Sequence, residues 1–138
     1  HTDGDSLVYW TDGNVLHMGD TYFNGMLPFI DLNSGGSIDG AIAAAEKGLA
    51  LSNEKSIIVP GHGPVASKAD LTRYRDMLVK LREGVAAGIA ADRPLDMIKA
   101  ERLADAYGKP DDFISPDASI EAVYKSIMEA PHQAPHKQ

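Results

Sequence analysis

The sequence contains no cysteine and comparatively few basic residues. Without cysteine, neither a disulfide nor a thiolate-ligated zinc site can form, and the choice between periplasm and cytoplasm stays open. Thirteen Lys and Arg stand against twenty Asp and Glu, which gives a formal net charge of −7. Because nucleic acids and anionic membrane surfaces attract clustered bases, this balance argues against both as partners.

Long hydrophobic runs are also missing, and no apolar stretch approaches the ~20 residues that a membrane span requires. The 138 residues are 43% hydrophobic, which suits one globular domain with a buried core. We predict a single domain over residues 1–130 and a disordered tail over residues 131–138. His132 and His136 are four positions apart, but the prolines beside them oppose the helix that would align them, so both are assigned to the tail.

Net negative charge concentrates in the first half of the chain, because bases are scarce there. Residues 1–63 hold eight of the twenty acids but only two of the thirteen bases. Such a surplus of carboxylates suits a cation-binding site, and an ordinary solvated surface gives the same count.

The first local signal is a β-hairpin followed by a long loop. Residues 6–11 are rich in β-formers, Asp12-Gly13 is typical of a two-residue turn, and residues 14–18 read as the returning strand. Residues 19–36 then combine Gly, Asn and Pro with many apolar side chains. A loop of this length and composition favours a packed, functional segment.

Helices dominate the remainder. Ser37 has the character of an N-cap for a helix that runs to about Ser52. A short apolar strand over residues 56–59 follows, which we expect to be buried on both faces. Ser67 and Asp70 form a capping box at the start of a long amphipathic helix. Two more helices are expected, one from Pro94 to about Gly108 and one that carries Ile120, Val123, Tyr124 and Ile127.

Three residues in glycine-containing loops are candidates for chemistry: His1, Asp20 and His62. Asp20 follows the second strand and Gly19, and His62 follows the third strand and Gly61. Glycine beside such a side chain lets the backbone turn sharply and approach what the side chain holds. Two imidazoles and a carboxylate are a ligand set for zinc or non-haem iron. His and Asp are also ordinary turn residues, so their spacing alone leaves both interpretations open.

The segments HTDGDSLVYW, NVLHMGDTYFNG and IIVPGHGPV, in this order, resemble the C-terminal half of a metallo-β-lactamase-fold hydrolase. The resemblance covers residues 1–66 closely and the later helices loosely. It implies an α/β fold that forms half of a four-layer αββα sandwich, with a small sheet covered by helices on one face. It also implies a metal site between the two sheets of the complete fold.

The resemblance implies a role for each candidate ligand. His1 would be the third histidine of a first zinc site, Asp20 the carboxylate that bridges two Zn2+ ions, and His62 a ligand of the second ion. The expected activity is hydrolysis of an ester, thioester, lactam or phosphodiester bond in a small-molecule substrate by water that the metals activate. A mononuclear iron dioxygenase of the same fold, or a non-catalytic binding module, are the alternatives.

One departure from the family is large, because its His-x-His-x-Asp-His motif is absent. We therefore expect the chain to be a fragment that is inactive alone and associates with a missing N-terminal half or with a second copy of itself. The same half-fold leaves one apolar face of the sheet bare. The residues expected to need cover are Leu7, Tyr9, Val15, Ile57 and Val59.

Further positions keep two interpretations each. The side chains of Tyr22, Phe23, Asn24 and Met26 either line a substrate pocket near Asp20 or belong to the core. His17 either orients a ligand or is a packed strand residue. The stretch 34–37 either binds an anion at a helix N-terminus or simply caps the helix.

Overall fold

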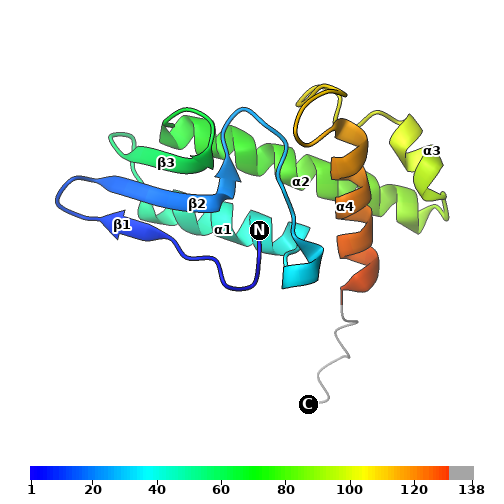
Figure 1. Ribbon diagram of the computed structural model, residues 1–138, viewed down its shortest axis with the longest axis horizontal. Coiled ribbons are helices and arrows are strands. Elements are labelled where there is room, and N and C mark those ends of the chain that lie inside the picture. The colour runs from blue at the N-terminus through cyan, green and yellow to red at the C-terminus, as the bar shows by residue number, and fades with distance from the viewer. Residues whose placement is uncertain (131–138) are drawn as a thin grey trace, which may run out of the picture.

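The computed structural model describes residues 1–130 and centres on a three-stranded sheet with the strand order β1-β2-β3 (Figure 1). Strand β1 (Val8–Trp10) is antiparallel to β2 (Val15–Phe23), and β2 is parallel to β3 (Ile57–His62). The predicted α/β class, with a small sheet and helices, is confirmed. His132 and His136 lie outside the described residues.

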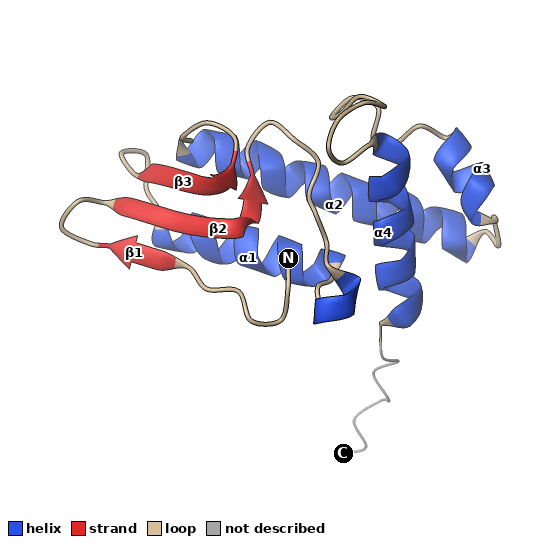
Figure 2. Ribbon diagram, viewed as in Figure 1, coloured by secondary structure: helices blue, strands red, loops and turns tan. Residues whose placement is uncertain are grey.

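Helices α1 (Ile38–Leu51) and α2 (Lys68–Ala90) lie along one face of the sheet (Figure 2). The shorter α3 (Leu95–Ala100) and α4 (Pro116–Glu129) pack on each other, and α4 also packs on α2 beyond the sheet. A 3-10 turn, η1 (Leu32–Ser34), precedes α1. Within residues 1–130, no helix combines the length and apolar character needed to cross a membrane.

The strand register decides which side chains form the core. Tyr9, Leu16 and Ile58 stand in one row across the three strands. Leu16 and Ile58 are fully buried, and Tyr9 packs against the same core. Because alternate residues point to opposite faces, this row marks the helix-covered face of the sheet.

The opposite face of the sheet is open. Trp10, Val15 and Ile57 form the adjacent row, in which Trp10 is 54% and Ile57 48% exposed. The predicted bare face is therefore present at Val15, Ile57 and Val59, which are exposed or half-buried. The prediction that Leu7 and Tyr9 also belong to the bare face is wrong, because both residues pack against the core. The expectation that residues 56–59 are buried on both faces is also wrong.

The hairpin forms where predicted, but its turn differs. The last paired residues are Trp10 and Val15, so the loop contains four residues rather than two. Asn14, not Gly13, takes the left-handed conformation, with φ of 51°. Its side-chain oxygen accepts hydrogen bonds from the Tyr9 hydroxyl at 2.9 Å and from the Ser56 hydroxyl at 2.6 Å. The turn is thus held by contacts to the distant loop before β3.

The predicted helix starts are confirmed. The Ser37 hydroxyl accepts the Gly40 N–H at the start of α1, and Ser67 and Asp70 form a reciprocal capping box at the start of α2. The helix predicted from Pro94 to Gly108 is much shorter and ends at Ala100. Arg102 has a φ of 56° there, a left-handed conformation that an α-helix cannot continue through.

Substitution of Asn14 tests the turn. We expect Asn14→Gly to keep the left-handed backbone but to lose the side-chain hydrogen bonds, at a cost of about 1 kcal/mol. Asn14→Ala loses the hydrogen bonds and also disfavours the left-handed backbone. It should lower the free energy of unfolding by a further 1–2 kcal/mol, roughly the penalty for a left-handed residue that has a Cβ. Urea unfolding measures both values. Equal stability of the two variants would show that backbone conformation at this position is unimportant.

Candidate metal centre

The structure brings His1, Asp20 and His62 together. The His62 Nε2 atom lies 3.3 Å from Asp20 Oδ1, and the His1 Nε2 atom lies 3.9 Å from Asp20 Oδ2. The two imidazoles therefore approach different oxygens of one carboxylate. The side chains of Asp20 and His62 are 44% and 50% exposed, whereas that of His1 is 19% exposed.

Asp20 lies within β2, not after it, at a bend in the strand. The ladder between β2 and β3 is irregular from His17 to Phe23, and Gly19 has a φ of 54°. The Gly19 N–H donates to His17 Nδ1 at 3.0 Å. His17 thus fixes the backbone immediately before Asp20, which is an orienting role through the main chain rather than a contact with another imidazole.

Gly61 lets the two strands meet closely enough for Asp20 to reach His62. A Cβ at position 61 would overlap Asp20 Oδ1 and would lie 2.6 Å from the Gly19 carbonyl oxygen. The missing side chain is therefore required by the close approach of β3 to the carboxylate. The sequence indicated a glycine next to the ligand, and the structure shows which atoms need it.

His1 is held by the loop around η1. Its carbonyl oxygen accepts the Asp31 N–H at 3.0 Å, and a Cβ at Gly36 would overlap that same oxygen. Its Nδ1 atom lies 3.2 Å from Asp5 Oδ1, so Nε2 is the ring atom directed at Asp20. A carboxylate on the other ring nitrogen is a common device for orienting a histidine ligand.

Asp5 is a site residue that sequence reasoning missed. Partial burial acts to raise the pKa of this carboxyl, but the hydrogen bond from the Thr2 N–H at 2.5 Å and the His1 amino group at 3.0 Å together outweigh it, so the pKa of Asp5 is lowered. Asp5 is thus ionised and able to accept a hydrogen bond from the His1 Nδ1–H. The acidic HTDGD stretch was the sequence feature that could have indicated it. The sequence does not show which of Asp3 and Asp5 is used, because only the folded turn brings Asp5 to the His1 ring.

His62 ends β3 and is held by its neighbour strand. Its carbonyl oxygen accepts the Asn24 N–H at 2.9 Å, and its ring lies 4.4 Å from the ring of Phe23, centroid to centroid. The contact with a buried aromatic ring fixes one side of the imidazole and leaves the other toward Asp20.

The donor set fits zinc chemically. Two imidazole nitrogens and a carboxylate are zinc ligands, and adjacent ligands of a tetrahedral ion with bonds of about 2.1 Å lie roughly 3.4 Å apart. The separations of 3.3 and 3.9 Å are close to that value. Within residues 1–130, however, no three or more His, Asp or Glu side chains form a cluster that could hold a metal ion by itself.

The four residues for which a pocket or the core was predicted differ in burial. Tyr22 and Phe23 are 0% and 2% exposed and belong to the core, although Phe23 also lines a small pocket together with Met26. The rings of Tyr22 and Tyr74 pack at 4.8 Å, and burial raises the pKa of both hydroxyls. Asn24 and Met26 do line a groove at the surface.

The stretch 34–37 serves as a helix cap. The Ser37 hydroxyl accepts the Gly40 N–H, and the Ile38 N–H donates to the Ser126 hydroxyl at 2.9 Å. Asp39 and Glu129 line the adjacent hollow. Two carboxylates there oppose an anion, so the capping interpretation is the one the contacts favour.

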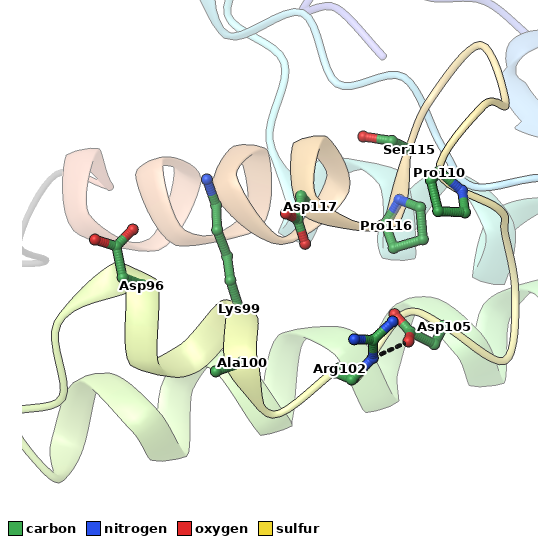
Figure 3. Close-up of a pocket in the computed structure, with 9 residues that line it drawn as sticks. All are labelled: Asp96, Lys99, Ala100, Arg102, Asp105, Pro110, Ser115, Pro116 and Asp117. Atoms are coloured by element: carbon green, nitrogen blue, oxygen red, sulfur yellow. Dashed lines mark hydrogen bonds and ion pairs between the residues drawn. The ribbon is translucent and has the colours of Figure 1, made fainter.

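A cleft of about 520 Å3 between α3 and the start of α4 contains none of the candidate ligands (Figure 3). Its two bases are already paired: Arg102 with Asp105, as Figure 3 shows, and Lys99 with Glu121 at 2.9 Å. Hydrogen bonds from Lys125 and Lys99 lower the pKa of Glu121 to about 2. The Lys99–Glu121 pair connects α3 to α4, and the pairs together leave no net positive charge to attract a ligand.

Comparison with known proteins finds similarity at the level of the fold. No known protein-family profile matches the sequence, and no curated protein does. The structure is similar to that of a double mutant of the sec-alkyl sulfatase PisA1, an enzyme of the metallo-β-lactamase fold, with a TM-score of 0.66 and 16% identity. The match covers 93% of this chain and 25% of the sulfatase, so the chain spans about a quarter of that enzyme's length.

Gly61→Ala tests the close approach of β3 to Asp20. The added methyl group must displace the carboxylate or the strand, and we expect a loss of about 1–3 kcal/mol in the free energy of unfolding. Gly4→Ala is the matched control, because a Cβ there meets nothing within 4 Å. Thermal unfolding and the imidazole NMR resonances report the outcome. Unchanged stability together with unchanged resonances would contradict the arrangement.

Glu121→Gln tests the ion pairs of Glu121 with Lys99 of α3 and with Lys125 of α4. Since folding lowers the pKa of Glu121 from 4.5 to about 2, its contribution is complete above pH 4.5 and is lost as the pH falls toward 2. The side chain is 37% exposed, so we expect a loss of under about 1 kcal/mol at pH 7. Urea unfolding at several pH values should show the difference from wild type shrinking below pH 4.5. A difference that does not depend on pH would contradict the pairing.

Proposed function

We propose that this chain is part of a zinc-dependent hydrolase of the metallo-β-lactamase fold, to which it contributes His1, Asp20 and His62. The observation that carries the proposal is the placement of two imidazoles on opposite oxygens of one carboxylate. The fold similarity to a stretch of a sec-alkyl sulfatase supports it. The ordered motifs of the sequence support it independently.

In this proposal Asp20 would help to hold both ions, one together with His1 and the other together with His62. When bound, the ions would supply Lewis acidity toward the bond to be cleaved and would lower the pKa of water. Asp5 would keep the His1 Nδ1 proton in place and so keep Nε2 available as the ligand atom.

The open face of the sheet belongs to the same proposal. A four-layer sandwich packs two sheets face to face about 10 Å apart. The side chains of Val8, Trp10 and Ile57 are 47–54% exposed and would form half of such an interior. The remaining half of the protein, or a second copy of the chain, would cover them and add the ligands that the described residues do not provide.

Metal analysis of the complete protein tests the proposal. Zinc content and hydrolysis of a panel of ester, thioester, lactam, phosphodiester and sulfate-ester substrates are measured for wild type, Asp20→Asn and Asp92→Asn. We expect Asp20→Asn to lose zinc and to fall to the background rate. Asp92, an exposed acid after the end of α2 whose left-handed backbone Asn also adopts, serves as the control and should change neither value.

A variant with a partial expected effect extends the same experiment. Asp5→Asn keeps all three ligands and should weaken zinc binding by about 10–100-fold. Iron in place of zinc in protein purified without added metal would favour the dioxygenase alternative. Unchanged metal content and unchanged hydrolysis in Asp20→Asn would remove the proposed centre and favour a non-catalytic binding module.

A further inference from the structure

A group of exposed apolar side chains lies beside the candidate metal centre. Phe113 is 82% exposed, Met26 41% and Phe29 39%. Phe23, Met26 and Phe113 line a pocket of about 210 Å3 together with Gly25, Leu27, Asp112 and Ile114. The rings of Phe29 and Phe113 lie 6.5 Å apart, centroid to centroid. We call the surface formed by Phe23, Met26, Phe29 and Phe113 the apolar cleft.

The apolar cleft is continuous with the candidate metal centre through both imidazoles. The ring of His1 lies 5.7 Å from that of Phe29, and the ring of His62 lies 4.4 Å from that of Phe23. A molecule with a polar group at Asp20 would therefore reach the cleft across either histidine. The exposed Met97 and Met128 lie on α3 and α4, helices that carry none of the candidate ligands.

The loop that carries Phe113 has a defined structure. Gly108 packs against Leu27 so closely that a Cβ would lie 2.6 Å from Leu27 Cδ1. The Asp112 carboxylate accepts the Lys109 N–H at 2.7 Å, and the Asp112 N–H donates to the Lys109 carbonyl at 3.1 Å. The loop thus presents Phe113 outward from an anchored turn. Grouped exposed aromatic rings of this kind mark binding surfaces more often than isolated ones do.

The size and charge of the apolar cleft limit what it can hold. A closed apolar cavity of 150 Å3 is enough for benzene, so the pocket of about 210 Å3 admits a group of similar size. Asp112 is the one charged residue among those that line it, and its carboxylate is already hydrogen bonded within the loop. A carboxylate at the rim disfavours an anionic ligand group and is compatible with a neutral one.

We propose that the apolar cleft binds a neutral apolar group, of about the size of a phenyl ring or a short branched alkyl chain, in the molecule whose hydrolysable bond lies at the metal centre. Binding of the apolar group follows from the cleft alone. Its being part of a hydrolysed substrate rests on the proposed function. The proposal therefore adds a substrate class, polar at one end and apolar at the other, to the proposed hydrolase.

Methionine methyl NMR of the chain with benzyl alcohol as the probe tests the cleft. The five methionines include Met26 in the cleft, Met97 and Met128 exposed elsewhere, and Met18 in the core. We expect saturable shifts at Met26 and none at Met18, Met97 or Met128. Phe113→Ala should weaken the binding at least fivefold, Phe113→Leu should weaken it less, and Met97→Ala should leave it unchanged.

Two results would overturn the proposal that the apolar cleft binds an apolar group. Equal shifts at Met26, Met97 and Met128 would mean that benzyl alcohol partitions non-specifically onto exposed apolar residues. A Met26 shift that follows protein concentration without benzyl alcohol would mean that a second copy of the chain covers this surface. Because Phe113 is exposed, its substitution is expected to leave the fold intact, and thermal unfolding of each variant verifies this.

Hydrolysis by the complete protein separates this inference from the proposed function. Pairs of substrates that differ only in a phenyl or a methyl group are compared for wild type and Phe113→Ala. We expect the KM to rise at least fivefold for the phenyl substrate alone. If benzyl alcohol binds at Met26 but the complete protein contains no zinc and hydrolyses no substrate, the proposed function is refuted and the proposal for the apolar cleft stands. If the complete protein hydrolyses phenyl and methyl substrates equally well and benzyl alcohol does not shift Met26, only the proposal for the apolar cleft is refuted.

Discussion

The close approach of β3 to the carboxylate of Asp20 is the constraint on which the rest of the arrangement depends. Parallel pairing brings the ends of β2 and β3 to the same edge of the sheet, and the bend at Gly19 turns Asp20 toward β3. His62 can meet Asp20 there only because Gly61 has no side chain. Gly36 does the same for His1 by leaving room for its carbonyl oxygen. Glycines that resemble simple turn residues in the sequence are contact positions in the structure.

The two faces of the sheet have different physical roles that meet at this bend. One face carries Leu16 and Ile58 into the helical core, whereas the other keeps Trp10 and Ile57 half exposed. His17 stands in register with Val8 and Val59 and therefore belongs to the open face. Its Nδ1 atom accepts the Gly19 N–H and so fixes the bend that directs Asp20. Any element that packed on the open face would touch the residue that positions the carboxylate.

The sequence predicted the features that depend on local pattern, and the structure decided those that depend on distant contacts. Ser37 and Ser67 mark helix starts because a cap needs only its own first turn. The Asp12-Gly13 signal misplaced the turn because Asn14 is held by Ser56, 42 residues away. The helix after Pro94 was predicted too long because Arg102 adopts a left-handed φ that its residue type does not reveal. Tyr22 and Phe23 were ambiguous for the same reason, since only the packing of Tyr74 and the core shows that they are buried.

The candidate ligands and the open face of the sheet are both exposed, and burial of either places a requirement on what covers it. Asp20 and His62 are about half exposed, and in the described residues they form no complete metal cluster with His1. The apolar side chains Trp10 and Ile57, on the open face toward the other end of the same sheet, are exposed to a similar degree. Burial of that row gains roughly 25 cal/mol for each Å2 of apolar area removed from water, and burial of the carboxylate is favourable only if opposite charge or hydrogen bonds accompany it. A second layer that covered the open face from this row as far as Asp20 would exclude water from the carboxylate, so it would also have to bring cations or their ligands with it. The hydrophobic and the electrostatic requirement would then be met by the same association, which makes metal binding and sheet packing one coupled equilibrium in the proposed enzyme.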